Sequence, residues 1–286
     1  MLYYERYLEA VSYIKARIKE PIPETAIVLG AGLENIVQRM DDKKVIPYTE
    51  IPHFSTITFG ENNGELVYGH INYVPVLVMN GITSYFEGYD MEQITFPIRV
   101  FNKLGVKNLI LIGPVSGLNS NYMPGDFMIV NDHINLSGIS PLYGKNYNEF
   151  GPRFVDMNNA YDKTLINLLY DIAREIALPI NEGVYAYMPE PNYETPAEVN
   201  MLRTIGADVS GRTIVPEVIV AKHCGLRVLA LTYITNMGAG VSNYKLSNEE
   251  INENIEKVNE QFYMVIQKLT ASLYIKNRNH VLELGE

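Results

Sequence analysis

The chain has 286 residues, of which 33 are acidic and 23 are basic, so its formal net charge at pH 7 is −10. That sign of charge argues against nucleic acid or an anionic membrane as the main partner, because both present negative charge to a protein. The single cysteine, Cys224, excludes an internal disulfide framework and fits a reducing compartment, so we expect a cytoplasmic protein.

The chain begins with an amphipathic helix, predicted over residues 3–18 from apolar side chains at helical spacing. This stretch is charged and contains no apolar run resembling a signal peptide or a membrane span. A short buried strand at 26–29 then enters the turn Gly30–Leu33, where a glycine-bearing loop exposes N–H groups that favour anions. Asn35 replaces the third glycine of a dinucleotide fingerprint, so the turn does not predict NAD binding. A tight turn without a ligand is an equal alternative.

Apolar strands and glycine-rich loops continue through the middle of the chain. The remaining strands of this part are predicted at 65–68, 74–79, 108–112, 127–130 and 183–187. The helices are predicted at 96–104, 160–177 and 196–205, and the loops at 80–89, 113–119, 137–155 and 189–195. The run at 108–112 has no polar alternation, which is typical of a parallel strand buried on both faces.

The stretch Ala207–Val228 combines a polar turn with a capped helix. Pro216 stands just inside the predicted helix start, and Gly225 is the expected C-terminal cap. The strand that follows, 228–234, delivers Asn236 at its carboxyl end, where α/β proteins commonly bind small molecules. A last helix is expected from Asn248 to about residue 276. We see no repeat, low-complexity tract or linker, so residues 1–286 are expected to form a single domain.

Nine short motifs follow one another along the chain. They are LGAGL at 29–33, IPHF at 51–54, FEGY at 86–89, TFPIRVF at 95–101, SGLN at 116–119, GD…DHINL at 125–136, NYETPAE at 192–198, VPEVIVAKHCGLRV at 215–228 and ITNMGAG at 234–240. In this order they resemble the trimeric purine nucleoside phosphorylases, and the resemblance covers residues 26 to 276. It implies a single α/β domain with a mixed, distorted barrel-like β-sheet flanked by helices. It also implies a homotrimer, with active sites near the subunit boundaries, that cleaves the N-glycosidic bond of purine nucleosides with inorganic phosphate.

The resemblance places two catalytic residues beside the purine. Glu194 stands where the family's Glu contacts N1 and the exocyclic edge, and Asn236 where its Asn contacts N7 and the 6-substituent. Asn at this position is similar to members that act on 6-oxopurine nucleosides such as inosine and guanosine. The resemblance also implies four further substrate-binding residues. Tyr193 packs on the base, Phe86 contacts the ribose and Asn248 contacts the 5′-hydroxyl. Phe150 is the aromatic residue that a neighbouring subunit contributes.

The phosphate site departs from the family's pattern. Ala31 stands where the family has a Ser or Thr hydroxyl. Ile82 and Ser84 stand where it has an Arg and a His. Asn62 stands near the position of its phosphate-loop His. The phosphate-binding set that remains is Gly30, Ala31, Thr213 and Glu87. Each lost charged contact is worth about 1.5–3 kcal/mol, so the combined loss corresponds to roughly three decades in rate if nothing compensates.

Arg212 stands where the family carries a Met beneath the ribose. It either binds an anion or blocks the sugar site, and a salt bridge to Glu87 or Glu190 is a further alternative. Three functions follow: a purine nucleoside phosphorylase with a rearranged phosphate site, a nucleoside-cleaving enzyme with another acceptor such as water, or an inactive purine-binding homologue. We predict weak or absent phosphorolysis by the usual route, no metal site, and no cofactor beyond phosphate as a co-substrate.

Overall fold

The computed structural model describes residues 3–58, 64–241 and 248–283, and within these ranges it omits the side chains of residues 3, 248–257 and 276–283. Its strands are β1 (Thr25–Leu29), β2 (Asp41–Pro47), β3 (Glu65–Ile71), β4 (Val74–Asn80), β5 (Asn108–Gly117), β6 (Phe127–Asn135), β7 (Ile180–Tyr187), β8 (Val209–Gly211) and β9 (Arg227–Met237). Its α-helices are α1 (Tyr3–Ile18), α2 (Glu34–Gln38), α3 (Met91–Leu104), α4 (Lys163–Glu175), α5 (Pro196–Thr204), α6 (Val215–His223) and α7 (Asn248–Glu283).

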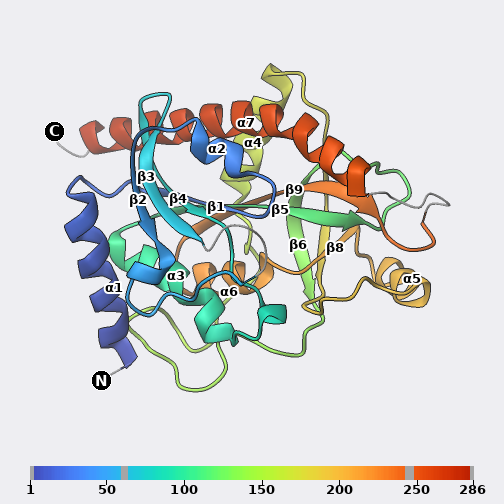
Figure 1. Ribbon diagram of the computed structural model, residues 1–286, viewed down its shortest axis with the longest axis horizontal. Helices are drawn as coiled ribbons and strands as arrows, with labels where there is room; N and C mark the ends of the chain where they lie inside the picture. The colour runs from blue at the N-terminus through green and yellow to red at the C-terminus, as the bar shows by residue number, and fades with distance from the viewer. Residues whose placement is uncertain (1–2, 59–63, 242–247, 284–286) are drawn as a thin grey trace.

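One mixed sheet joins all of these strands, and part of it closes into a barrel (Figure 1). The strand order is β2-β3-β4-β1-β5-β8-β7-β6-β9, and β9 pairs back onto β5. The pairs β4–β1, β1–β5 and β5–β9 are parallel. The pairs β5–β8 and β6–β9 are antiparallel. The expected barrel-like mixed sheet in an α/β domain is therefore confirmed.

Helices cover the sheet from two sides (Figure 1). On one side α1 packs on α3 and α3 on α6, and on the other α7 packs against α4, β9 and β4. The interior strands are apolar throughout, as in β1, whose five residues are all buried. None of the described helices is long and apolar enough to cross a membrane.

The structure corrects several predicted boundaries. The expected glycine-rich loop at 113–119 continues strand β5 as far as Gly117, because Gly113–Gly117 pair with β9. Helix α3 begins at Met91 rather than at residue 96, because Asp90 and Gln93 form a reciprocal capping box there and Pro97 lies inside the helix. Strand β2 and the short strand β8, which falls in the expected polar turn, were not predicted.

Candidate active site

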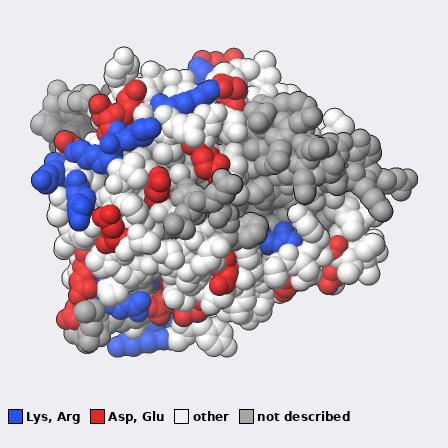
Figure 2. Space-filling view, viewed as in Figure 1, with Lys and Arg blue, Asp and Glu red and all other residues white. Residues whose placement is uncertain are grey.

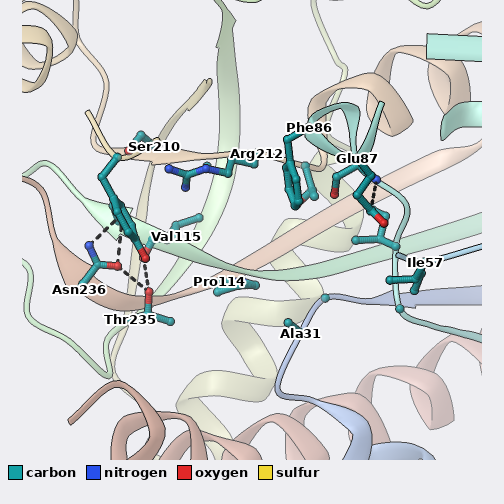
Figure 3. A pocket seen from close by; sticks show the side chains of 18 of the residues that line it. Ala31, Ile57, Phe86, Glu87, Pro114, Val115, Ser210, Arg212, Thr235 and Asn236 are labelled. Carbon is teal, nitrogen blue, oxygen red and sulfur yellow. Dashed lines mark hydrogen bonds between the residues drawn. The ribbon is translucent and has the colours of Figure 1, made fainter. Parts of the chain in front are cut away.

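A cavity of about 290 Å³ lies at the carboxyl ends of the parallel strands β1, β4, β5 and β9 (Figure 3). Its wall contains most of the residues singled out from the sequence: Gly30, Ala31, Ile82, Ser84, Phe86, Glu87, Tyr193, Arg212, Thr213 and Asn236. The other lining residues include Glu34, Ile57, Pro114, Val115, Ser116, Ser210 and Thr235. The carboxyl edge of parallel strands thus brings together segments that are far apart in the sequence.

One end of the cavity is formed by Asn236, whose side-chain amide is held in one orientation (Figure 3). The Thr235 hydroxyl donates to Asn236 Oδ1 at 2.8 Å. Asn236 Nδ2 donates to Ser116 Oγ at 3.0 Å and to the Met237 carbonyl oxygen at 3.3 Å. Because a donor lies against its oxygen and two acceptors lie against its nitrogen, the amide presents a defined polar edge to the cavity.

Glu194 is a buried residue of the 189–195 loop, next in the sequence to the cavity-lining Tyr193. It is 5% exposed, and its Oε1 atom has no hydrogen-bond partner. Glu194 itself is not part of the cavity wall, whereas its neighbour Tyr193 lines it and is 65% exposed. The next residue, Thr195, is the N-cap of α5, and its reciprocal bonds with Glu198 anchor the loop's end. An unpaired buried carboxylate oxygen requires an explanation, and a ligand donor is one.

Arg212 connects two loops across the cavity. Its Nε and Nη2 atoms donate to the carbonyl oxygens of Glu190 and Asn192, each at 2.8 Å. Its guanidinium also lies over the ring of Tyr193, 5.0 Å from the centroid. The guanidinium therefore binds main-chain oxygens of the 189–195 loop, in place of the salt bridge that the sequence left open.

The turn that carries Thr213 into the cavity has a strained backbone. Ile214 has φ 78° and ψ −55°, and Val215 N–H donates to the Thr213 carbonyl oxygen at 2.9 Å, which makes a three-residue turn. A β-branched residue seldom adopts this conformation, and such strain is concentrated at functional sites. The Tyr185 hydroxyl accepts a hydrogen bond from Thr213 N–H at 3.3 Å, and a Cβ at Gly211 would overlap that hydroxyl.

Glu217 lies below this turn, in the first turn of α6, and is 2% exposed. Neither oxygen of its carboxyl group has a hydrogen-bond partner by geometry. Burial raises the pKa of Glu217 to about 7, although the peptide N–H groups of Glu217 and Ile214 act in the opposite direction. An acidic residue in the first turn of a helix is favourable when exposed, so the local sequence pattern does not show this burial.

The Gly30–Leu33 loop is held from behind by two other elements. The Tyr233 hydroxyl on β9 donates to the Ala31 carbonyl oxygen at 2.9 Å, and Asn259 Nδ2 on α7 donates to the Gly32 oxygen at 3.2 Å. On the cavity side, Gly32 N–H donates to Glu34 Oε1 at 3.2 Å. Glu34 was not singled out from the sequence, because nothing in the local pattern shows that its side chain turns back onto the loop.

The opposite end of the cavity contains Glu87, whose carboxylate organises its own loop (Figure 3). Glu87 Oε1 accepts from Ser84 N–H at 2.8 Å, and Oε2 accepts from Thr58 N–H at 2.6 Å and from the Thr58 hydroxyl at 2.9 Å. Both oxygens therefore have donors from the chain itself.

Ala31, Ile82 and Ser84 all line the cavity, at the positions where the resemblance implies phosphate contacts.

Besides Glu194, three predicted residues are not among the described lining residues of the cavity. Phe150 is 5% exposed and packs inside its own chain, with its ring 4.9 Å from that of Tyr7 and with Lys103 Nζ 4.7 Å above it. In this chain the Phe150 ring completes the aromatic cluster between α1 and α3, and its contact with a neighbour's pocket stays a prediction. Asn248 begins α7, but its side chain lies outside the described part of the structure, as does the whole of Asn62.

The charged groups of the cavity wall are few. Among its described residues they are Glu34, Glu87 and Arg212, with no lysine or histidine. Within the described ranges, no group of three or more His, Cys, Asp or Glu side chains is arranged to hold a metal ion. On the outer surface, Figure 2 shows acidic and basic side chains interspersed over the face in view.

Comparison with known proteins gives consistent matches along the chain. The family model described as Phosphorylase superfamily matches residues 24–271. Purine nucleoside phosphorylase 1 of Bacillus subtilis (strain 168) is 42% identical over 267 residues, which cover 93% of this chain and 98% of that protein. Purine nucleoside phosphorylase of Bos taurus is 36% identical over 277 residues, covering 94% and 96%.

Solved structures agree with these relatives. The structure of isoform 2 of purine nucleoside phosphorylase from Schistosoma mansoni, in complex with cytosine and ribose-1-phosphate, superposes with a TM-score of 0.87 at 36% identity. A Schistosoma mansoni purine nucleoside phosphorylase in complex with hypoxanthine has a TM-score of 0.86, also at 36% identity. Both alignments cover 93% of this chain and 96% of the compared chain.

Proposed function

The chain belongs to the phosphorylase superfamily and is a purine nucleoside phosphorylase-type pentosyltransferase, and on this premise we propose that it cleaves 6-oxopurine nucleosides of the inosine and guanosine type. The single observation that carries the choice of base is the oriented amide of Asn236 in the cavity wall. The unpartnered Oε1 of Glu194, beside the lining residue Tyr193, adds an acceptor to the proposal. Schistosoma mansoni structures named for inosine, hypoxanthine and adenosine support purine nucleosides as the substrate class, so the choice of base rests on the site.

The chemistry requires the purine to leave with the electron pair of the glycosidic bond. Groups that bind the base more tightly as it gains negative charge therefore accelerate the step. In the proposed complex Glu194 accepts from N1–H of the purine, and the Asn236 amide contacts N7 and O6. On binding, the hydrogen bond from Asn236 Nδ2 to the Met237 carbonyl oxygen, 3.3 Å long in this structure, is replaced by one to the purine. Tyr193, which is 65% exposed, packs on the base, and Phe86 contacts the ribose.

Calorimetric titration with hypoxanthine, guanine and adenine tests the choice of base. We expect the two 6-oxopurines to bind at least ten-fold more tightly than adenine, which is about 1.4 kcal/mol. Asn236→Asp should reduce or reverse that preference, because a carboxylate accepts from an exocyclic amino group and repels a carbonyl oxygen. Glu194→Gln should lower the affinity for hypoxanthine. Asn158→Asp, at an exposed position outside the cavity, serves as the control. Equal affinity for adenine in the unmodified protein would refute the choice of base.

Phosphate is the acceptor that the family implies, and we propose that this chain uses it weakly. In support, Ala31, Ile82 and Ser84 line the cavity without supplying the hydroxyl, guanidinium and imidazole that the resemblance leads us to expect. Gly30 N–H donates to the Ile112 carbonyl oxygen at 2.7 Å, so the Ala31 amide, Thr213 and Glu87 are what remains of the expected phosphate-binding set. A second candidate reaction, transfer to water, is favoured by the two carboxylates in the wall. As proposed, neither reaction requires a metal or an organic cofactor.

We also propose that the protein forms a homotrimer in which one subunit completes the cavity of the next. Phe150 is buried in its own chain. Phe154, four residues later, is 89% exposed, so its ring is available for a neighbouring subunit. An aromatic side chain so exposed is the kind of residue that interfaces use.

A further inference from the structure

The cavity side of the Gly30–Leu33 loop is in contact with a carboxylate of the chain itself. Glu34 lines the cavity together with Gly30 and Ala31, and its Oε1 accepts from Gly32 N–H at 3.2 Å. Behind the loop, Tyr233 and Asn259 hold the Ala31 and Gly32 carbonyl oxygens. Gly30 N–H donates to the Ile112 carbonyl oxygen at 2.7 Å and Gly32 N–H to the Glu34 carboxylate, so two of the loop's N–H groups already have acceptors within the chain.

The charge of the wall adds to this effect. With both carboxylates ionised, Glu34, Glu87 and Arg212 give the described wall a net charge of −1. The guanidinium of Arg212 already donates to two carbonyl oxygens, and the oxygens of Glu87 already accept from Ser84 and Thr58. A phosphate ion carries about −1.5 to −2 at neutral pH. It would enter beside two like charges and would compete with Glu34 for Gly32 N–H.

We propose that Glu34 determines the acceptor of this cavity, because its carboxylate occupies the anion-binding loop and so keeps phosphate out. The acceptor class that remains is a neutral nucleophile, of which water is the smallest. In hydrolysis the C1′–N9 bond breaks with its electron pair going to the purine, and the water oxygen bonds to C1′. The proton that water loses balances the proton that the purine gains. This assignment of the acceptor rests on the proposed cleavage of nucleosides, whereas the exclusion of phosphate does not.

Two substitutions separate the charge of Glu34 from its hydrogen bond. Glu34→Gln removes the charge and leaves an acceptor for Gly32 N–H, whereas Glu34→Ala removes both. Each variant is titrated with inorganic phosphate by calorimetry at constant ionic strength, with chloride as the reference salt. Glu175→Gln is the control, because Glu175 is an exposed carboxylate on α4 that pairs with Lys268 and lies outside the cavity. Hypoxanthine affinity is measured on the same samples, so that folding and the purine half of the cavity are monitored separately.

We expect the unmodified protein and Glu175→Gln to bind phosphate with a Kd above about 10 mM, which is typical of a weak contact. Glu34→Gln should bind phosphate at least ten-fold more tightly, and Glu34→Ala at least as tightly as Glu34→Gln. Tight phosphate binding by the unmodified protein, or phosphate affinity unchanged in both Glu34 variants, would overturn the role of Glu34. The absence of purine binding in all samples would instead count against the proposed function. The phosphate titrations would then still decide whether Glu34 excludes phosphate.

Discussion

At the scale of single residues, the buried carboxyl group of Glu217 couples pH to the stability of the turn that carries Thr213. Its folded pKa of about 7 lies above the ordinary value of 4.5. Between these values the folded chain holds a proton that the unfolded chain has released, so the stability that this group contributes is complete below pH 4.5 and is lost as pH rises through 7. The expected loss is about 3 kcal/mol.

Glu217→Gln tests this coupling, because an amide of the same shape stays neutral at every pH. We expect the free energy of unfolding of the unmodified protein to fall, relative to the variant, between pH 5 and pH 8. The variant should then be the more stable of the two at pH 8. Urea unfolding at pH 5, 6.5 and 8 measures the difference. Two parallel pH curves would show that Glu217 does not titrate in this range.

At the scale of elements, Arg212 acts as a bridge between the turn before α6 and the loop before α5. Arg212→Met should loosen the loop that presents Tyr193 and Glu194, because two donors to carbonyl oxygens are lost. We expect hypoxanthine affinity to fall several-fold while phosphate affinity stays unchanged, and Arg212→Lys should fail to rescue it, because one ammonium does not reproduce the planar fork. Calorimetry with both ligands measures this. Phosphate affinity that falls with Arg212→Met would show that Arg212 is an anion ligand after all.

The sequence predicts the elements well where one signal dominates. The β1 strand and its glycine turn are evident from apolar residues followed by Gly30 and Gly32, and α6 from Pro216 and Gly225. The continuation of β5 through Pro114 was missed, because it depends on pairing with β9, which is more than a hundred residues away. The cavity residues show the same difference between local and long-range signals. Asn236 could be inferred from its strand end, but the turn of Glu34 back onto Gly32 depends on a geometry with no local signature.

At the scale of the whole molecule, the proposed trimer predicts that Phe154 contributes to binding in a neighbour. Phe154→Ala should leave each chain folded, since the side chain is 89% exposed, and should weaken hypoxanthine binding. Tyr143→Ala is a matched control at 85% exposure. Light scattering gives the mass and calorimetry the affinity. A monomeric mass at micromolar concentration, or an unchanged affinity in Phe154→Ala, would count against a shared cavity.

The cavity presents an oriented Asn236 amide at one end, and its wall also contains the carboxylates of Glu34 and Glu87. The most direct measurement is the rate of hypoxanthine release from inosine as phosphate is raised from zero to 10 mM, with the sugar product identified. The account predicts that the rate changes less than about three-fold, under 1 kcal/mol in the barrier, and that the sugar product is free ribose. A rate that rises with phosphate to saturation, with ribose 1-phosphate as the main product, would contradict it.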